Sequence, residues 1–211
     1  MKRTENLSKI DFIEHGFCNR EDSKFVQNPI LMNQVHSPDV MCVEKFLDDA
    51  PKVDALITKE KGLVLTVKTA DCAPVLIVDK KNKIIAAIHA GWRGAFQGVI
   101  ENTVLKMLQM GAEISEMVAG IGPHIQKKSF LADEKMKALF PITEHHFFKG
   151  RETGDGYLFD FDGYVLYRIK RAGILNVESV LDDTYQNMSY LSYRRDPENP
   201  GRQYSYIQIV K

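Results

Sequence analysis

The chain has 211 residues, of which 44% are hydrophobic, and 28 basic side chains balance 28 acidic ones. This length and hydrophobic content can fill one sizeable core, so we expect a single domain over residues 1–211. A formal net charge of zero argues against nucleic acid or an anionic membrane as the main partner. No apolar run reaches the ~20 residues of a membrane span, and no apolar segment follows the N-terminal basic residues. We therefore expect a cytoplasmic protein.

The first third of the chain shows short β-type segments separated by turn signals. Strands are predicted at residues 11–20, 40–44, 55–58 and 63–67. The last of these segments is nearly continuous in apolar residues, which is typical of a strand buried on both faces.

The middle of the chain holds the clearest β signal. Two apolar runs, residues 73–78 and 84–88, flank the polar turn 79–83 and predict a buried strand pair. Cys72 stands just before the first strand, and His89 stands at the end of the second. Because the start of one hairpin strand lies beside the end of the next, we expect these two side chains at one end of the sheet. A thiol and an imidazole there can form half a metal site or a nucleophile–base pair.

Helical periodicity begins after a glycine-containing turn at residues 90–94. Apolar residues recur every three or four positions over residues 96–108 and predict a helix, which Gly111 should end. The remaining pattern predicts strands at residues 117–121, 157–161, 177–181 and 204–210, helices at residues 133–140 and 162–172, and a loop at residues 144–156. This mixture predicts an α/β fold, with an α+β mixed sheet and flanking helices.

Three potential metal ligands, His36, Cys72 and His89, each lie next to a turn at or near a strand end. Two histidines and a cysteine leave one open position on a tetrahedral zinc ion, which lowers the pKa of bound water towards ~7. The spacing is not that of a compact zinc motif. We therefore give equal weight to a purely structural role for the three residues. In that case the cysteine is a buried hydrophobic residue, and each histidine is only hydrogen-bonded within the fold.

The two other cysteines, Cys18 and Cys42, have no histidine at a useful spacing. An odd number of cysteines fits free thiols or a metal ligand in a reducing compartment better than a disulfide framework. We expect both residues to be core or inert thiols.

Charged residues near the predicted ligands could bind an anion or carry a proton. Asp71 could orient a histidine, act as a base, or only bond to its own turn. Arg93 lies where free backbone N–H groups and the dipole of the following helix favour an anion. Arg20, Arg194 and Arg195 are further candidates for anion binding, and the alternative for each is a solvated surface charge.

Short motifs then occur in a characteristic order. They are QVH at residues 34–36, DAL at 54–56, TADCAPV at 69–75, HAGWRG at 89–94, IGP at 121–123, SYRRD at 192–196 and GR at 201–202. Together they resemble the YfiH/YlmD family, also called the laccase-domain, DUF152 or polyphenol oxidase family. The resemblance runs over residues 15–202, nearly the whole chain.

The resemblance implies a purine nucleoside phosphorylase that also has adenosine deaminase and methylthioadenosine phosphorylase activity. It implies zinc ligands from two histidines and a cysteine, here His36, Cys72 and His89, with Asp71 as a further catalytic candidate. We expect purine nucleoside and phosphate to be bound by Arg20, Gln34, Arg93 and Arg194. The implied fold is similar to the catalytic domain of cytotoxic necrotizing factor, whose site is a Cys–His pair.

Two segments depart from the family pattern. Residues 21–23 stand where a glycine-rich segment usually follows the position of Arg20, which affects the expected lid of the pocket. Asp183 and Thr184 stand where the family has Cys-Thr, which we expect to matter little because the pair is not among the three ligands.

Three enzyme classes follow from these residues. The first is a zinc enzyme acting on purine nucleosides, and the second is a copper-dependent phenol oxidase. Six histidines, of which three are well placed, argue against the several coppers of a multicopper oxidase. The third is a metal-free hydrolase or amidase acting on cell-wall precursors, with Cys72 as nucleophile and His89 as base. A non-enzymatic binding module is least favoured, and the oligomeric state is left open.

Overall fold

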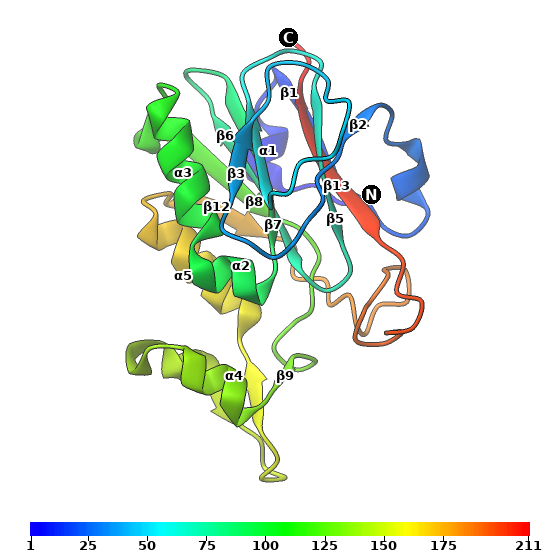
Figure 1. The fold of residues 1–211 in the computed structure, drawn as a ribbon, viewed down its shortest axis with the longest axis vertical. Coiled ribbons are helices and arrows are strands. Elements are labelled where there is room, and N and C mark those ends of the chain that lie inside the picture. The colour runs from blue at the N-terminus through cyan, green and yellow to red at the C-terminus, as the bar shows by residue number, and fades with distance from the viewer.

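The computed structural model describes residues 1–211, except for the side chain of Phe25. A six-stranded mixed sheet forms its centre, with strand order β12-β8-β6-β7-β4-β3 (Figure 1). Its strands are β12 (Asn176–Ser179), β8 (Met117–Ile121), β6 (Ala73–Asp79), β7 (Ile84–Ala90), β4 (Ala55–Thr58) and β3 (Val40–Cys42). The outer pairs β3–β4 and β12–β8 are parallel, and the central pairs are antiparallel.

A second sheet packs against one face of the first, with strand order β1-β13-β5-β2. Its strands are β1 (Ile13–Phe17), β13 (Gln203–Ile209), β5 (Val64–Thr69) and β2 (Pro29–Ile30). Strand β6 shows how the layers form, because its side chains alternate between two faces. Leu76 and Val78 join the core between the sheets, while Val75 and Ile77 join the core under the helices. Burial of each such side chain stabilises the fold by about 1.5–3 kcal/mol.

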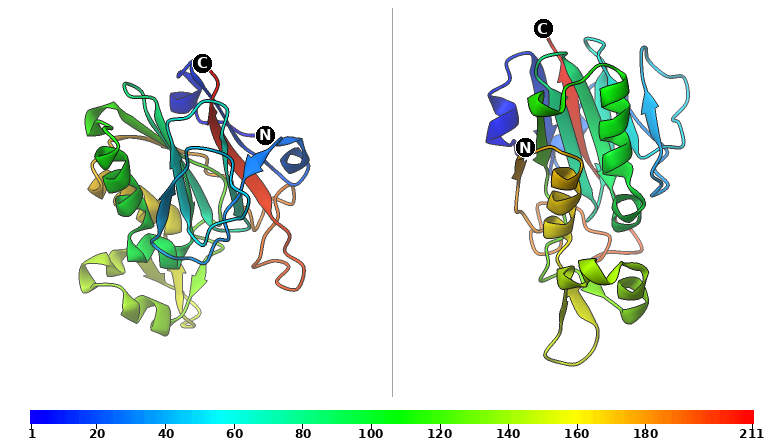
Figure 2. Two further views of the ribbon diagram at one scale, coloured as in Figure 1. Left: turned by 45° about the horizontal axis from the view of Figure 1, so that its top comes forward. Right: turned by 90° about the vertical axis from the view of Figure 1, so that its left-hand side faces the viewer.

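Helices cover the opposite face of the six-stranded sheet (Figures 1 and 2). The two longest are α3 (Val99–Gln109) and α5 (Phe161–Arg171), and the short α2 (Trp92–Gln97) leads into α3. The N-terminal α1 (Glu5–Ser8) lies beside β8 and β12, where the Glu178 carboxylate accepts hydrogen bonds from its first N–H groups. The result is three layers of helices, sheet and sheet.

A small lobe extends from the end of the molecule near α2 (Figure 1). It contains α4 (Glu134–Leu139) and a three-stranded sheet of β10 (Phe148–Gly150), β11 (Tyr157–Phe159) and β9 (Leu131–Ala132). Short 3-10 helices lie here and elsewhere, at η3 (Ile142–Phe147), η1 (Asp22–Phe25) and η2 (Ile114–Glu116). Aromatic rings join the lobe to the helical layer, since Phe140 contacts both Phe159 and Tyr164. We refer to residues 130–160 as the lobe.

Most predicted elements are confirmed, including the hairpin and the mixed α/β architecture. The helix predicted over residues 96–108 is instead two helices, because Gly98 adopts φ = 100° between them, which only glycine does at little cost. The loop predicted for residues 144–156 is wrong in its first half, where η3 and β10 form. The carboxylate of Asp133 caps α4 by accepting from Met136 N at 2.7 Å.

Among the described residues, no helix combines the length and the apolar character needed to cross a lipid bilayer. The cytoplasmic location stays a prediction.

Candidate functional site

His36, Cys72 and His89 meet at one end of the six-stranded sheet. The hairpin register pairs Pro74 with His89, so Cys72 stands two positions before the residue opposite the histidine. One ligand atom from each of the three side chains lies within 4.8 Å of the other two. The rings of His36 and His89 form a T-shaped pair with centroids 4.8 Å apart. The predicted convergence of these residues is confirmed.

Asp54 fixes two of these three residues with one carboxylate. The fully buried aspartate lies just before β4, and its Oδ1 lies 2.7 Å from Nδ1 of His89. The same carboxylate accepts hydrogen bonds from the backbone N–H groups of Val35, His36 and Ser37, at 2.7–3.1 Å. These bonds hold His36 in the left-handed conformation, with φ = 60°. A carboxylate on the far nitrogen of a histidine fixes its tautomer and leaves Nε2 free to bind.

Burial and nearby charges set the protonation of the two histidines in opposite directions. Burial lowers the pKa of His36, and the neighbouring His89 lowers it further. Burial also opposes the charged form of His89, but Cys72 and Asp54 outweigh it and raise the pKa of His89 to about 9. For Asp54, burial favours the neutral acid, yet the hydrogen bonds from His89 and Ser37 prevail and lower its pKa. The site is thus a cluster of an acid, a thiol and two imidazoles in close electrostatic contact.

The space between His36 and Cys72 has the form expected of a metal site. Nδ1 of His36 is buried and has no hydrogen-bond partner among the described residues, and a buried polar atom of this kind needs one. Gly91 borders the same space, because a Cβ there would collide with the His36 ring and lie 3.2 Å from Sγ of Cys72. Two nitrogens and a sulfur around one point are a donor set that zinc and copper both accept.

Asp71 organises the opposite side of the site. It has φ = 81°, which is unusual for a residue with a side chain, and its carboxylate accepts three hydrogen bonds. The donors are Oγ1 of Thr184 at 2.7 Å, Oγ of Ser192 at 3.0 Å and the backbone N–H of Arg194 at 2.7 Å. This aspartate therefore anchors the segment of residues 184–194 beside the three candidate metal ligands. Its proposed role as a proton carrier stays a prediction.

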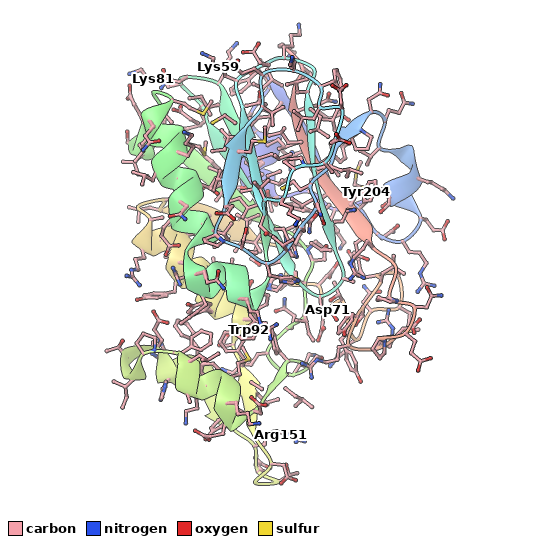
Figure 3. The ribbon with its side chains drawn as sticks, viewed as in Figure 1. Lys59, Asp71, Lys81, Trp92, Arg151 and Tyr204 are labelled. Carbon is pink, nitrogen blue, oxygen red and sulfur yellow. The ribbon has the colours of Figure 1, made fainter. Side chains whose placement is uncertain are left out.

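The three ligands border a cavity of about 480 Å³. Its walls combine cations, aromatic rings and the ligands, and the residues that line it are Gln34, His36, Lys68, Ala70, Asp71, Cys72, His89, Trp92, Arg93, Ile125, Phe130, Phe161, Tyr193, Arg194 and Arg202. Figure 3 shows Asp71 and Trp92 at the end of the main body that faces the lobe. Aromatic walls suit a flat ring, and the surrounding cations suit an anion.

The residues predicted to bind substrate occupy different places. Arg93 and Arg194 both line the cavity and are exposed to solvent. Gln34 also lines it, but its amide is bound in both directions by the backbone of Lys68, at 2.7 and 2.8 Å. Arg20 is exposed and is not one of the cavity-lining residues given above. Its part in substrate binding stays a prediction that this geometry does not support.

Sequence reasoning missed several residues of the site. Lys68 and Arg202 line the cavity, and Asp54 holds the ligands. A signal for Lys68 was present, because it is the one charged residue in the apolar run that became β5. Asp183, which stands where the family has cysteine, accepts a hydrogen bond from Oγ of Ser129, and the hydroxyl of the adjacent Thr184 binds Asp71 directly. The side chain of Arg195 donates to the backbone carbonyls of Thr184, Tyr185 and Tyr190.

Residues 18–210 match the family model described as "Multi-copper polyphenol oxidoreductase laccase". The chain belongs to this family. Curated relatives include purine nucleoside phosphorylase RP494 of Rickettsia prowazekii, which is 36% identical over 92% of this chain and 79% of its own length. Purine nucleoside phosphorylase YfiH of Escherichia coli is 32% identical over 86% of this chain and 74% of its own length. Homologues named as enzymes thus support an enzymatic function for this member of the YfiH family.

Solved structures give the same assignment. The crystal structure of the Neisseria meningitidis protein NMB0706, described as DUF152, superposes with a TM-score of 0.79 at 31% identity, covering 90% of this chain and 78% of the other. The YfiH structure from Bacillus licheniformis gives a TM-score of 0.78 at 26% identity, with 87% and 74% coverage. The mixed α/β fold is therefore that of the YfiH structures.

Proposed function

We propose that this protein is a zinc-dependent purine nucleoside phosphorylase. The observation that carries the proposal is the position of the His36–Cys72–His89 cluster, which lies on the wall of a cavity that also has aromatic and cationic walls. The names of the relatives support the same reaction and imply a nucleoside and phosphate as substrates. The nucleoside substrates would be adenosine, inosine, guanosine and methylthioadenosine.

Phosphorolysis breaks the bond between ribose C1′ and the base nitrogen and forms a bond from C1′ to a phosphate oxygen. The departing base takes a proton, and ribose 1-phosphate remains. Phosphate must therefore lie beside C1′, and its charge must be neutralised there. Lys68, Arg93, Arg194 and Arg202 can hold it, since all four line the cavity and cations bind phosphate through charge-assisted hydrogen bonds. The rings of Phe130 and Tyr193 offer faces for the base.

The residues present fit a single metal ion. Cys72 Sγ, His89 Nε2 and the unpartnered Nδ1 of His36 would hold it, and Asp54 would keep both histidines in place. When bound, zinc supplies a Lewis acid with one position left for an oxygen of phosphate or water. We also propose adenosine deaminase activity at this open position of the metal. Water would take the place of phosphate there, and its oxygen would replace the C6 amino group of adenosine, which leaves as ammonia.

The family description favours a second candidate, a copper-dependent phenol oxidase. Against it, His36, Cys72 and His89 form the one group of three such ligands found in the part of the chain that the structure describes. A multicopper enzyme needs several such groups. Elemental analysis of protein purified without added copper separates the two candidates, because zinc supports phosphorolysis and stoichiometric copper supports oxidation.

Cys72 lies in close contact with His89, which is itself bound to Asp54, and this resembles the arrangement of nucleophile, base and acid in a hydrolase. A metal-free hydrolase is therefore a third candidate. In that enzyme, however, Nδ1 of His36 has no function and is left unsatisfied. Activity that resists chelators but is lost on alkylation of Cys72 would favour this candidate over the zinc enzyme.

The direct test supplies inosine and phosphate to the purified protein and measures hypoxanthine and ribose 1-phosphate. We expect Cys72→Ala and His89→Ala to abolish the reaction. Cys42→Ala is the matched control, because that thiol contacts Met110 and is not part of the ligand cluster. Absence of ribose 1-phosphate with the wild type, or undiminished product from the two ligand variants, would end the proposal.

A further inference from the structure

A groove opens from the cavity towards the lobe. It has a volume of about 750 Å³ and shares four lining residues with the cavity, namely Trp92, Arg93, Phe130 and Arg194. Figure 3 shows Trp92 at the start of this path and Arg151 near the far end of the lobe. The two hollows therefore adjoin each other, and the shared residues form the junction between them.

Two cation–π pairs make up the junction. The guanidinium of Arg93 lies 4.3 Å from the centre of the Trp92 ring, and that of Arg194 lies 5.4 Å from the centre of Phe130. Arg194 is also fixed at both ends, since its backbone N–H donates to Asp71 and its side chain donates to the carbonyl of Leu131. Both arginines are thus placed by the fold, with N–H groups left to bind an anion.

The outer part of the groove adds further positive charge. Lys135 and Arg151 line the groove and are absent from the cavity wall. The described ion pairs involve neither of these residues nor the two junction arginines. Two acids also line the groove, and one of them, Asp133, is occupied as the cap of α4. Four cations against two acids leave the groove positive.

We propose that the cavity and the groove form one site for purine nucleosides that carry a phosphate chain on the 5′ carbon. The first phosphate would lie between Arg93 and Arg194 at the junction, and a second would reach Lys135 and Arg151. Nucleoside 5′-phosphates would then bind in competition with nucleosides and, because they use Arg93 and Arg194, in competition with inorganic phosphate at these two residues. This inference rests on the proposed function only in placing a purine nucleoside in the cavity.

The charge arrangement predicts that affinity rises with the number of phosphates. We expect AMP to bind about tenfold more tightly than adenosine, and ADP more tightly again, because each phosphate meets further cations. The gain should shrink as salt is raised, because Lys135 is exposed and Arg151 is only half-buried, so that dissolved ions screen both charges.

Trp92 is the one tryptophan of the chain and lies at the junction, so its fluorescence reports binding without turnover. The metal-loaded protein is titrated with adenosine, AMP and ADP without added magnesium. Excitation uses the red edge of the tryptophan absorption, where purines do not absorb. Metal content is measured before and after each titration to show that the nucleotides have not removed the metal.

Lys135→Ala and Arg151→Ala, singly and together, test the outer cations. We expect the double variant to lose about tenfold of the ADP-over-adenosine preference. The matched control is Lys137→Ala, which removes a lysine from the same helix, but one that lies over the Tyr157 ring and is outside the groove lining. The control should keep the preference of the wild type.

Two results overturn the inference. Binding of adenosine without any gain from AMP or ADP removes the phosphate subsite and leaves the proposed phosphorolysis intact. An equal loss of preference in Lys137→Ala shows a general charge effect and also removes it. If adenosine, AMP and ADP all leave the fluorescence and a parallel calorimetric titration unchanged, both the inference and the purine site fail.

Discussion

Two aspartates on opposite sides of the site hold different parts of the structure in place. Asp54 is fully buried, stands just before a strand, and its carboxylate binds two metal-ligand candidates, the backbone N–H of His36 and the ring of His89. Asp71 lies at the cavity wall, and its carboxylate accepts hydrogen bonds from a long loop that carries Arg194. Asp54 binds His89 on strand β7 as well as the irregular residues 35–37, whereas Asp71, between β5 and β6, binds residues 184–194, which form neither helix nor strand. We therefore expect Asp54 to act on the proposed metal site and Asp71 to act on the position of Arg194 in the cavity.

The largest expected effect comes from Asp54→Ala. This change leaves the His89 ring and three backbone N–H groups without their acceptor in a buried place. Breaking such a buried charged network costs about 3–5 kcal/mol of unfolding free energy. We expect loss of bound metal and of activity together, measured by elemental analysis and urea denaturation. Full metal content in a stable Asp54→Ala variant would contradict the role given to this side.

Gly91→Ala tests metal binding separately from the stability of the fold. Gly91 has φ = −72° and ψ = 159°, a conformation that alanine adopts readily, so the change adds no backbone strain. Its methyl group would instead collide with the His36 ring. We expect metal binding to fall at least about tenfold, with a small loss of stability. Gly150→Ala is the control, since a Cβ there meets nothing within 4 Å.

Asp71→Asn should weaken substrate binding and leave metal binding unchanged. An amide presents an N–H₂ group to donors that now bind a carboxylate, so the loop of residues 184–194 loses part of its anchor. Loss of one or two hydrogen bonds to a charged group corresponds to about 1.5–3 kcal/mol. We expect KM for phosphate to rise about tenfold or more while metal content stays unchanged. A fall in kcat alone, with a shifted pH profile, would instead support Asp71 as a proton carrier.

The smallest effect on activity is expected at Asp79, at the opposite end of the β6–β7 hairpin. Its buried carboxylate accepts hydrogen bonds from Lys81 N, Asn82 N and Nδ2, and Glu113 N. Burial alone would raise the pKa of Asp79, but these hydrogen bonds prevail and lower it below its usual value. A lowered folded pKa gives stability that is present above the unfolded pKa and is lost as pH falls through the folded one.

Asp79→Asn should therefore reduce stability at neutral pH and flatten its decline in acid, with phosphorolysis unchanged at neutral pH. Denaturation curves between neutral and acid pH, compared with the wild type, measure this. An activity loss equal to that of Asp71→Asn would show that general hairpin stability, and not position at the site, explains the effects.

The sequence was informative where the physical pattern is local. The hairpin register follows from two apolar runs and one polar turn, and it brought Cys72 and His89 to the same end of the sheet. The helix break at Gly98 was missed because the apolar period continues through it, so that only the backbone conformation reveals the change.

Contacts between residues far apart in the chain could not be predicted from local sequence patterns. Asp54 lies 35 residues before His89, and Thr184 lies 113 residues after Asp71, so no periodicity connects these pairs. The groove was not foreseen either, because it forms only when the lobe packs near Trp92 and Arg93. Arg20 does not line the cavity in this structure, so its part in substrate binding stays a prediction.

The most direct test of the account measures metal and phosphorolysis on the same samples. Wild-type protein, its chelated form and the form reloaded with zinc are assayed with inosine and phosphate, and the metal per chain is determined in each. We predict one zinc ion per chain, activity that disappears with the metal and returns with it, and no metal in Cys72→Ala. Several copper ions per chain, or full activity in the metal-free protein, would contradict the account.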